Sequence, residues 1–138
     1  MIDHISLQVA DLGRSCAFYE AVLEPLLLTK LVVRDGAVGF GKRYPEFWLN
    51  LRELSAATAP DHGAHVALRA PSDQAVRDFH AKALNAGAQD DGPPGIRQAA
   101  MTTYFGAFIR DLDGNRVEVM RFPCGNTPQT QVDQKRAD

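Results

Sequence analysis

An internal repeat is the sequence feature that most constrains the fold. When the chain of 138 residues is shifted by 61 positions against itself, identical residues coincide: His4 with His65, Leu7 with Leu68, Phe18 with Phe79 and Leu23 with Leu84. A shift of 68 positions, which allows for unequal loops, places Leu49-Asn50-Leu51 on Val117-Glu118-Val119. All these pairs keep the two-residue alternation of a strand or the spacing of a helix, so the sequence predicts two copies of one supersecondary unit.

Each copy is predicted to contain a strand, a helix and three further strands. In the first copy we expect strands at 2–9, 27–33, 37–41 and 47–52, and a helix that Asp11 caps and Pro25 ends. In the second copy we expect a strand at 64–69, a helix over 72–86, a short strand near residue 88, a turn-rich stretch at 89–95 and a closing hairpin over 105–120. The core-facing residues predicted for the two helices are Phe18, Ala21 and Val22, then Val76, Phe79, Ala83 and Leu84.

These elements divide the chain into four segments. We expect a first βαβββ module over residues 1–54, a linker over 55–63, a second module over 64–122 and a polar tail over 123–138. A chain of this length is most simply one structural domain whose two halves share a core. The predicted fold class is α+β.

Composition excludes several classes of partner. The net charge is -2 and there is no block of Lys and Arg, which argues against nucleic-acid binding. No apolar stretch approaches the roughly 20 residues that span a membrane. The sequence enters a strand pattern at once, without a signal peptide, and its two cysteines lack metal or redox spacing, so we expect a cytoplasmic protein.

The repeat places four polar residues at equivalent points. His4 and His65 lie on the first strand of each copy, and Asn50 and Glu118 lie on the last, all on the face opposite the aliphatic one. Glu118 is a carboxylate between valines in an apolar hairpin, which is an unusual place for a charge. Two imidazoles and one carboxylate suit Fe, Mn, Ni, Co or Zn, so the predicted metal ligands are His4, His65 and Glu118, with Asn50 as a possible fourth position.

The alternative for each histidine is an ordinary structural or surface role, and a single strand histidine would usually have one. His62, in the linker, and His80, on the second helix, are expected to be exposed to solvent. Trp48, Arg69 and Tyr104 are candidate substrate-binding residues, since Trp48 shares a strand face with Asn50 and Arg69 shares one with His65.

The motifs of the chain, taken together, resemble those of the vicinal-oxygen-chelate superfamily, which includes glyoxalase I, bleomycin-resistance proteins and extradiol dioxygenases. They are Ile2-Asp-His-Ile-Ser-Leu, Arg14-Ser-Cys-Ala-Phe-Tyr19, Ala64-His-Val-Ala-Leu68 and Asp111-Leu-Asp-Gly-Asn-Arg-Val-Glu118. The resemblance implies paired glyoxalase-like modules that form a curved mixed sheet around a central cavity, and commonly a homodimer. It also implies a metal at the positions of His4, His65 and Glu118.

The position of Asn50 departs from glyoxalase I, which carries a ligand of Glu or Gln type there. Asparagine is one methylene shorter and cannot act as a general base, which argues against lactoylglutathione lyase activity, although Glu118 alone can still shuttle a proton. The remaining two histidines and one glutamate match the ligand set of extradiol dioxygenases and fosfomycin-modifying thiol transferases.

Three hypotheses follow. The first is an enzyme of lyase, isomerase or ring-cleaving dioxygenase type that uses a divalent metal ion on a small substrate with two adjacent oxygens, with Glu118 as its catalytic residue. The second is a metal-free protein that binds a small molecule or antibiotic, as bleomycin-resistance proteins do. The third, a purely structural domain, has no feature in its favour, and the three retained ligand residues favour the first.

Overall fold

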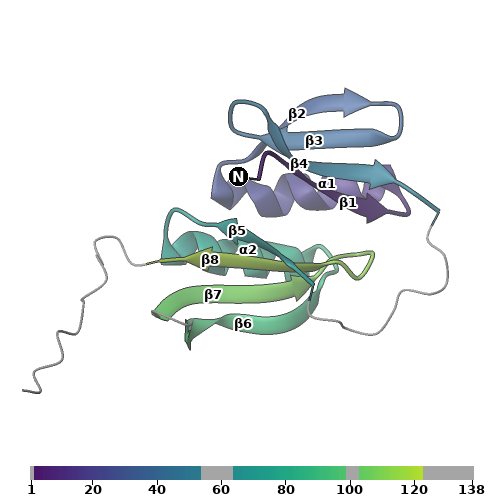
Figure 1. Ribbon diagram of the computed structural model, residues 1–138. Coiled ribbons are helices and arrows are strands. Elements are labelled where there is room, and N and C mark those ends of the chain that lie inside the picture. The colour runs from purple at the N-terminus through teal and green to yellow at the C-terminus, as the bar shows by residue number, and fades with distance from the viewer. Residues whose placement is uncertain (1, 54–63, 99–102, 123–138) are drawn as a thin grey trace, which may run out of the picture.

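A computed structural model describes residues 2–53, 64–98 and 103–122, and it contains two helices and two sheets (Figure 1). The elements of the first half are β1 (Ile5–Val9), α1 (Leu12–Leu23), a short 3-10 helix η1 (Glu24–Leu26), β2 (Thr29–Arg34), β3 (Ala37–Gly41) and β4 (Pro45–Leu51). Those of the second half are β5 (Val66–Arg69), α2 (Asp73–Asn85), β6 (Gln89–Gln98), β7 (Thr103–Arg110) and β8 (Arg116–Arg121). The predicted α+β fold of two βαβββ modules is confirmed. The predicted linker and tail lie outside the described residues, and so does His62.

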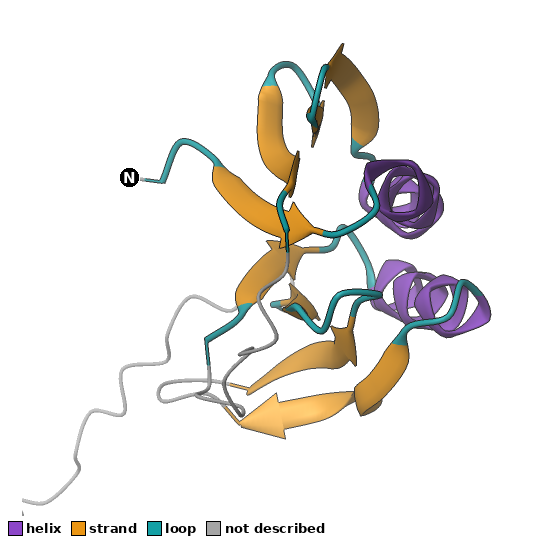
Figure 2. Ribbon diagram, turned by 90° about the vertical axis from the view of Figure 1, so that its right-hand side faces the viewer, coloured by secondary structure: helices purple, strands orange, loops and turns teal. Residues whose placement is uncertain are grey.

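Each module forms its own four-stranded mixed sheet, and the two sheets have the same topology. The strand orders are β1-β4-β3-β2 and β5-β8-β7-β6. In both sheets the first strand pairs in parallel with the last, and the remaining pairs are antiparallel. The edge strands β1 and β5 face each other where the two sheets meet (Figures 1 and 2).

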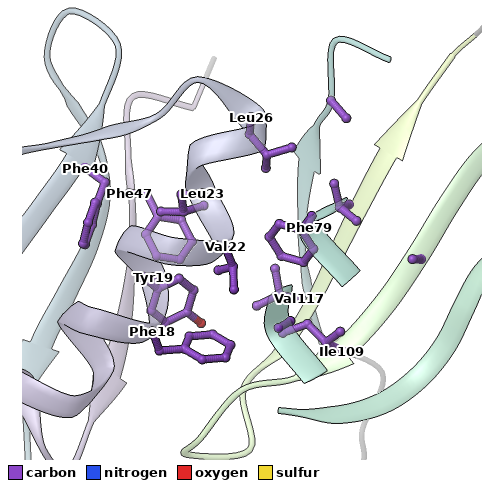
Figure 3. Close-up of a cluster of buried hydrophobic side chains, with 14 of the residues drawn as sticks. Phe18, Tyr19, Val22, Leu23, Leu26, Phe40, Phe47, Phe79, Ile109 and Val117 are labelled. Atoms are coloured by element: carbon purple, nitrogen blue, oxygen red, sulfur yellow. The ribbon is translucent and has the colours of Figure 1, made fainter. Parts of the chain in front are cut away.

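Both helices lie on the same side of the sheets (Figure 2), and buried side chains from the helices and the strands form one hydrophobic cluster. Figure 3 shows side chains of the two modules facing one another, with Val22 and Leu26 from the first and Phe79 and Val117 from the second. All four are at most 1% exposed. The modules therefore share one core, and the opposite face of each sheet carries no helix in the described part of the chain. None of the described helices is long and apolar enough to cross a membrane.

The structure corrects three predictions about individual elements. The stretch expected to be turn-rich forms β6, whose irregular pairing with β7 is interrupted around Gly92. Ala21 and Leu84 were predicted to face the core but are exposed, while Tyr19 is fully buried. His80 was predicted to be exposed, yet it is only 7% exposed, and its Nε2 lies 2.9 Å from Asp90 Oδ1. A polar residue occupies this edge of the helix because the strand beside it supplies a carboxylate.

The turn between β7 and β8, Asp111–Asn115, joins the two modules, and we call it the closing turn. Asp111 accepts four hydrogen bonds: from Tyr19 Oη at 2.6 Å, from the amide nitrogens of Asp113 and Asn115, and from Asn115 Nδ2. Asp113 accepts from the amide of Ala10 and from the Ser15 hydroxyl. Burial raises the pKa of Asp111, although these donors act to lower it. The closing turn is thus a polar contact that fastens the second module to the first.

The buried phenol of Tyr19 predicts a loss of stability at alkaline pH. Burial, and then the charge of Asp111, raise its pKa well above 10. Above about pH 10 the unfolded chain releases this proton while the folded chain keeps it, so the free energy of unfolding falls by up to about 1.4 kcal/mol per pH unit. Denaturant unfolding of the parent and of Tyr19→Phe at several alkaline pH values measures this, and the variant should have a shallower fall. Equal slopes in both proteins would contradict the assignment.

Candidate functional site

The sheet face that the helices leave uncovered carries the polar residues singled out by the repeat. On β4, Phe47 and Leu49 are buried in the core, so Trp48 and Asn50 alternate onto the opposite face. On β8, Val117 and Val119 are buried in the core, and Glu118 lies between them. Glu118 is nonetheless only 5% exposed, because its own neighbours on this face cover it.

Glu118 of β8 and His65, which precedes the edge strand β5, lie next to each other in the second module. His65 Nε2 lies 3.2 Å from Glu118 Oε2. The second carboxylate oxygen, Oε1, is buried and accepts no hydrogen bond of standard geometry within the described part of the chain, although the Tyr104 hydroxyl interacts with this carboxylate. Burying a carboxylate oxygen without a donor is costly, so the position is suited to an additional positive or proton-bearing group. A divalent cation between an imidazole and this oxygen fits that requirement.

Tyr104 of β7 lies beside the same carboxylate. Burial, and then its interaction with Glu118, raise the pKa of the phenol. The hydroxyl is therefore protonated at neutral pH and able to donate a hydrogen bond. The Tyr104 ring lies in the space that a side chain at position 106 would occupy. A Cβ on Gly106 would come within 2.7 Å of the ring.

Two arginines near this pair were not predicted from the sequence. Arg97 of β6 and Arg116 of β8 each lie over the ring of Phe108, at 5.2 and 4.8 Å from its centroid. Phe108 is the cross-strand neighbour of Glu118 and contacts the His65 ring at 5.6 Å. Arg116 also pairs with Asp91 at 2.7 Å. Arg97 comes just after the stretch predicted to be turn-rich, where no strand was expected, so no strand pattern related it to Glu118.

The first sheet has a separate open hollow of about 480 Å³, whose lining includes His4, Trp48 and Asn50. His4 Nδ1 lies 2.6 Å from Asp3 Oδ1, and Asn50 Nδ2 donates to the Ser6 hydroxyl at 2.8 Å. Three of the predicted site residues thus share one surface. The amide oxygen of Asn50 is the atom of this residue that a metal would use.

Within one chain the structure brings together two of the three predicted metal ligands. A second hollow is lined by Ile5 of the first module and by Ala67, Leu68 and Arg69 of the second. The start of β1 therefore lies beside the end of β5. The two strands run in opposite directions (Figure 1). His4 comes just before β1 and His65 just before β5, so the two histidines lie at opposite ends of the contact between these strands. Among residues 2–53, 64–98 and 103–122, no three His, Cys, Asp or Glu side chains are grouped closely enough to hold a metal.

Arg69, the remaining predicted substrate-binding residue, lies at the junction of the modules. It lines a smaller hollow of about 280 Å³, and its guanidinium lies 5.6 Å from the centroid of the Phe122 ring. Phe122 in turn contacts Tyr104 at 6.0 Å between ring centroids. Arg69 is thus connected to the Glu118 cluster through two aromatic rings.

Comparison with known proteins agrees with this architecture. A sequence profile described as the glyoxalase/bleomycin resistance protein/dioxygenase superfamily matches residues 1–119. A glyoxalase/bleomycin resistance protein from Albidiferax ferrireducens is 26% identical with a TM-score of 0.74, covering 87% of this chain and 98% of its own. A family enzyme from Burkholderia phytofirmans is 14% identical with a TM-score of 0.64, covering 87% and 97%, and shows the likeness of fold alone. The comparison with curated proteins gives no match. The chain belongs to the glyoxalase/bleomycin resistance protein/dioxygenase superfamily.

Proposed function

We propose that the protein is a metal-dependent enzyme that acts on a small molecule with two adjacent oxygens, in a reaction of lyase, isomerase or ring-cleaving dioxygenase type. The observation that carries the proposal is the buried Oε1 of Glu118, which stands beside His65 and accepts no hydrogen bond of standard geometry from the described residues. A divalent ion bound there would supply Lewis-acid chemistry to the two substrate oxygens. Fe, Mn, Ni, Co and Zn all accept this donor set.

The chain's own residues have distinct roles in this proposal. Glu118 would hold the ion together with His65, and its carboxylate would exchange a proton with the substrate. Tyr104, whose raised pKa keeps its hydroxyl protonated, donates a hydrogen bond to the substrate or to Glu118. Trp48 and Arg69 bind the remainder of the substrate.

A homodimer is the proposed active form, because one chain supplies only part of the ligand set. His4 and Asn50 lie on the first sheet, whereas His65 and Glu118 lie on the second. A second copy related by twofold symmetry would place its first sheet over the His65–Glu118 pair and complete the site with its own histidine. Each dimer would then contain two equivalent sites.

Metal titration of matched variants tests the site. Glu118→Gln and His65→Ala are each expected to weaken binding of a divalent ion by about a hundredfold or more, since even residues outside the ligand sphere typically cost 10–100-fold. Glu20→Gln, a change to a carboxylate exposed on α1, is the control and should leave the affinity unchanged. Unaltered metal affinity in Glu118→Gln would refute the proposed site.

Mixing two variants tests whether the site is shared between chains. His4→Ala and His65→Ala homodimers should both have defective sites. In a heterodimer of the two, one site carries both changes and the other carries none, so exchange of subunits should restore tight metal binding at one site per dimer. Restoration would not occur if both histidines of a site came from one chain.

The second candidate function is metal-free binding of a small molecule. The hollow around Trp48 favours it, because that hollow exists within one chain and needs no metal to form. Chelator treatment separates the two functions: ligand affinity that is unchanged after metal removal favours the binding protein, and affinity that is lost favours the enzyme.

A further inference from the structure

The hollow on the first sheet contains a positive charge that forms no ion pair with a carboxylate of the described residues. Arg34, at the end of β2, lines it and is exposed to solvent. Its guanidinium lies 5.2 Å from the centroid of the Trp48 ring. In the part of the chain that the structure describes, Arg34 forms no ion pair. The acidic residue of the wall, Asp3, lies instead against His4, at 2.6 Å.

The Trp48 ring, which forms the aromatic wall of the hollow beside Arg34, is held in place by neighbouring residues. Trp48 Nε1 donates to the carbonyl oxygen of Pro45 at 3.2 Å. A Cβ on Gly39 would come within 3.1 Å of the Trp48 ring and 2.8 Å of Pro45 Cβ, so the ring lies closely against β3 where a side chain is missing. The tryptophan is therefore a fixed apolar surface, and the arginine above it loses less freedom on binding a ligand than an unsupported one would.

We infer that this hollow binds a small organic anion, with its apolar body against Trp48 and its negative group on Arg34. The volume of about 480 Å³ lies within the range of ligand pockets. A guanidinium with unused donors recognises a carboxylate through charge-assisted hydrogen bonds. The inference deepens the proposed function, because His4 and Asn50 line the same hollow: it assigns an acidic substrate class and makes Arg34 a specificity-determining residue.

Fluorescence of Trp48 tests the inference, because this is the single tryptophan of the chain. Benzoate and benzamide are titrated into chelator-treated protein; they have nearly the same shape and differ in charge. Benzoate is expected to bind at least about tenfold more tightly, the usual worth of a hydrogen bond to a charged group. Arg34→Gln should abolish this preference. Arg14→Gln, a change to an exposed arginine on α1, should leave it intact.

Three results would overturn the inference: equal affinity for the two probes in the parent, no saturable change with benzoate, or a preference that survives in Arg34→Gln. Because the titration is performed without metal, its outcome is independent of the metal-binding experiments. Failure of metal binding with a retained benzoate preference would overturn only the proposed enzyme, and the reverse would overturn only the acidic substrate class.

Discussion

Replacing Phe79 by alanine is expected to lower the free energy of unfolding by about 3–5 kcal/mol, the largest effect we predict for a single core residue. Phe79 is fully buried on α2, at the point where the two modules meet (Figure 3). Its ring faces α1 as well as the second sheet, and neither can close the space without disturbing the other. The expected loss therefore includes both the transfer of the ring to water and the cavity left behind.

Urea unfolding followed by circular dichroism measures this difference, and Leu84→Ala on the same helix is the control. Leu84 is 38% exposed, so the control should lose less than about 1 kcal/mol. A similar loss in both variants would show that α2 does not pack through Phe79. Because the modules share one core, Phe79→Ala should still unfold in one transition.

Replacing Asp111 by alanine is expected to cost about 2–4 kcal/mol, although the residue is a charged group in a turn. Its carboxylate accepts four hydrogen bonds, including one from the buried Tyr19 hydroxyl at 2.6 Å. Alanine leaves these donors without an acceptor, and Asp111 itself is only 5% exposed, so water cannot fully replace the carboxylate. The substitution should also loosen the contact between the closing turn and α1.

The matched control for Asp111→Ala is Asp78→Ala on α2, where the carboxylate accepts a side-chain hydrogen bond from Gln74. Its expected cost is below about 1 kcal/mol. Hydrogen exchange adds a second measurement, since the amide of Ala10, just before α1, and that of Ser15, in the first turn of α1, should exchange faster in Asp111→Ala. Equal stability losses in the two variants would contradict the role given to the closing turn.

Sequence patterns predicted the elements better than the faces of the helices. The strand alternation that ends in Asn50 and Glu118 was read correctly, because a strand has only two faces and the apolar one must be buried. On α2, by contrast, the buried stripe includes His80 and excludes Leu84. The direction in which a helix presents its stripe depends on the neighbouring layers, and Asp90, which contacts His80, comes from a stretch that was predicted to be turn-rich.

The same contrast between local pattern and tertiary packing applies to the candidate site. The repeat indicated that His65 and Glu118 belong together, and the structure places them 3.2 Å apart. It also indicated that His4 has the equivalent position in the first module. In the structure His4 comes just before β1, as His65 comes just before β5. Equivalence in sequence, however, does not imply contact, because two equivalent strands that run in opposite directions carry their first residues to opposite ends.

By itself, the sequence determined that this chain consists of two βαβββ modules and which face of each sheet carries its polar residues. Both follow from local periodicity, which depends only on the spacing of apolar side chains. Only the tertiary structure decided that Asp111 fastens one module to the other, that Arg34 lies over Trp48, and that His4 and His65 are apart. These depend on how the modules pack, and residues brought together across a shared core need no pattern along the chain.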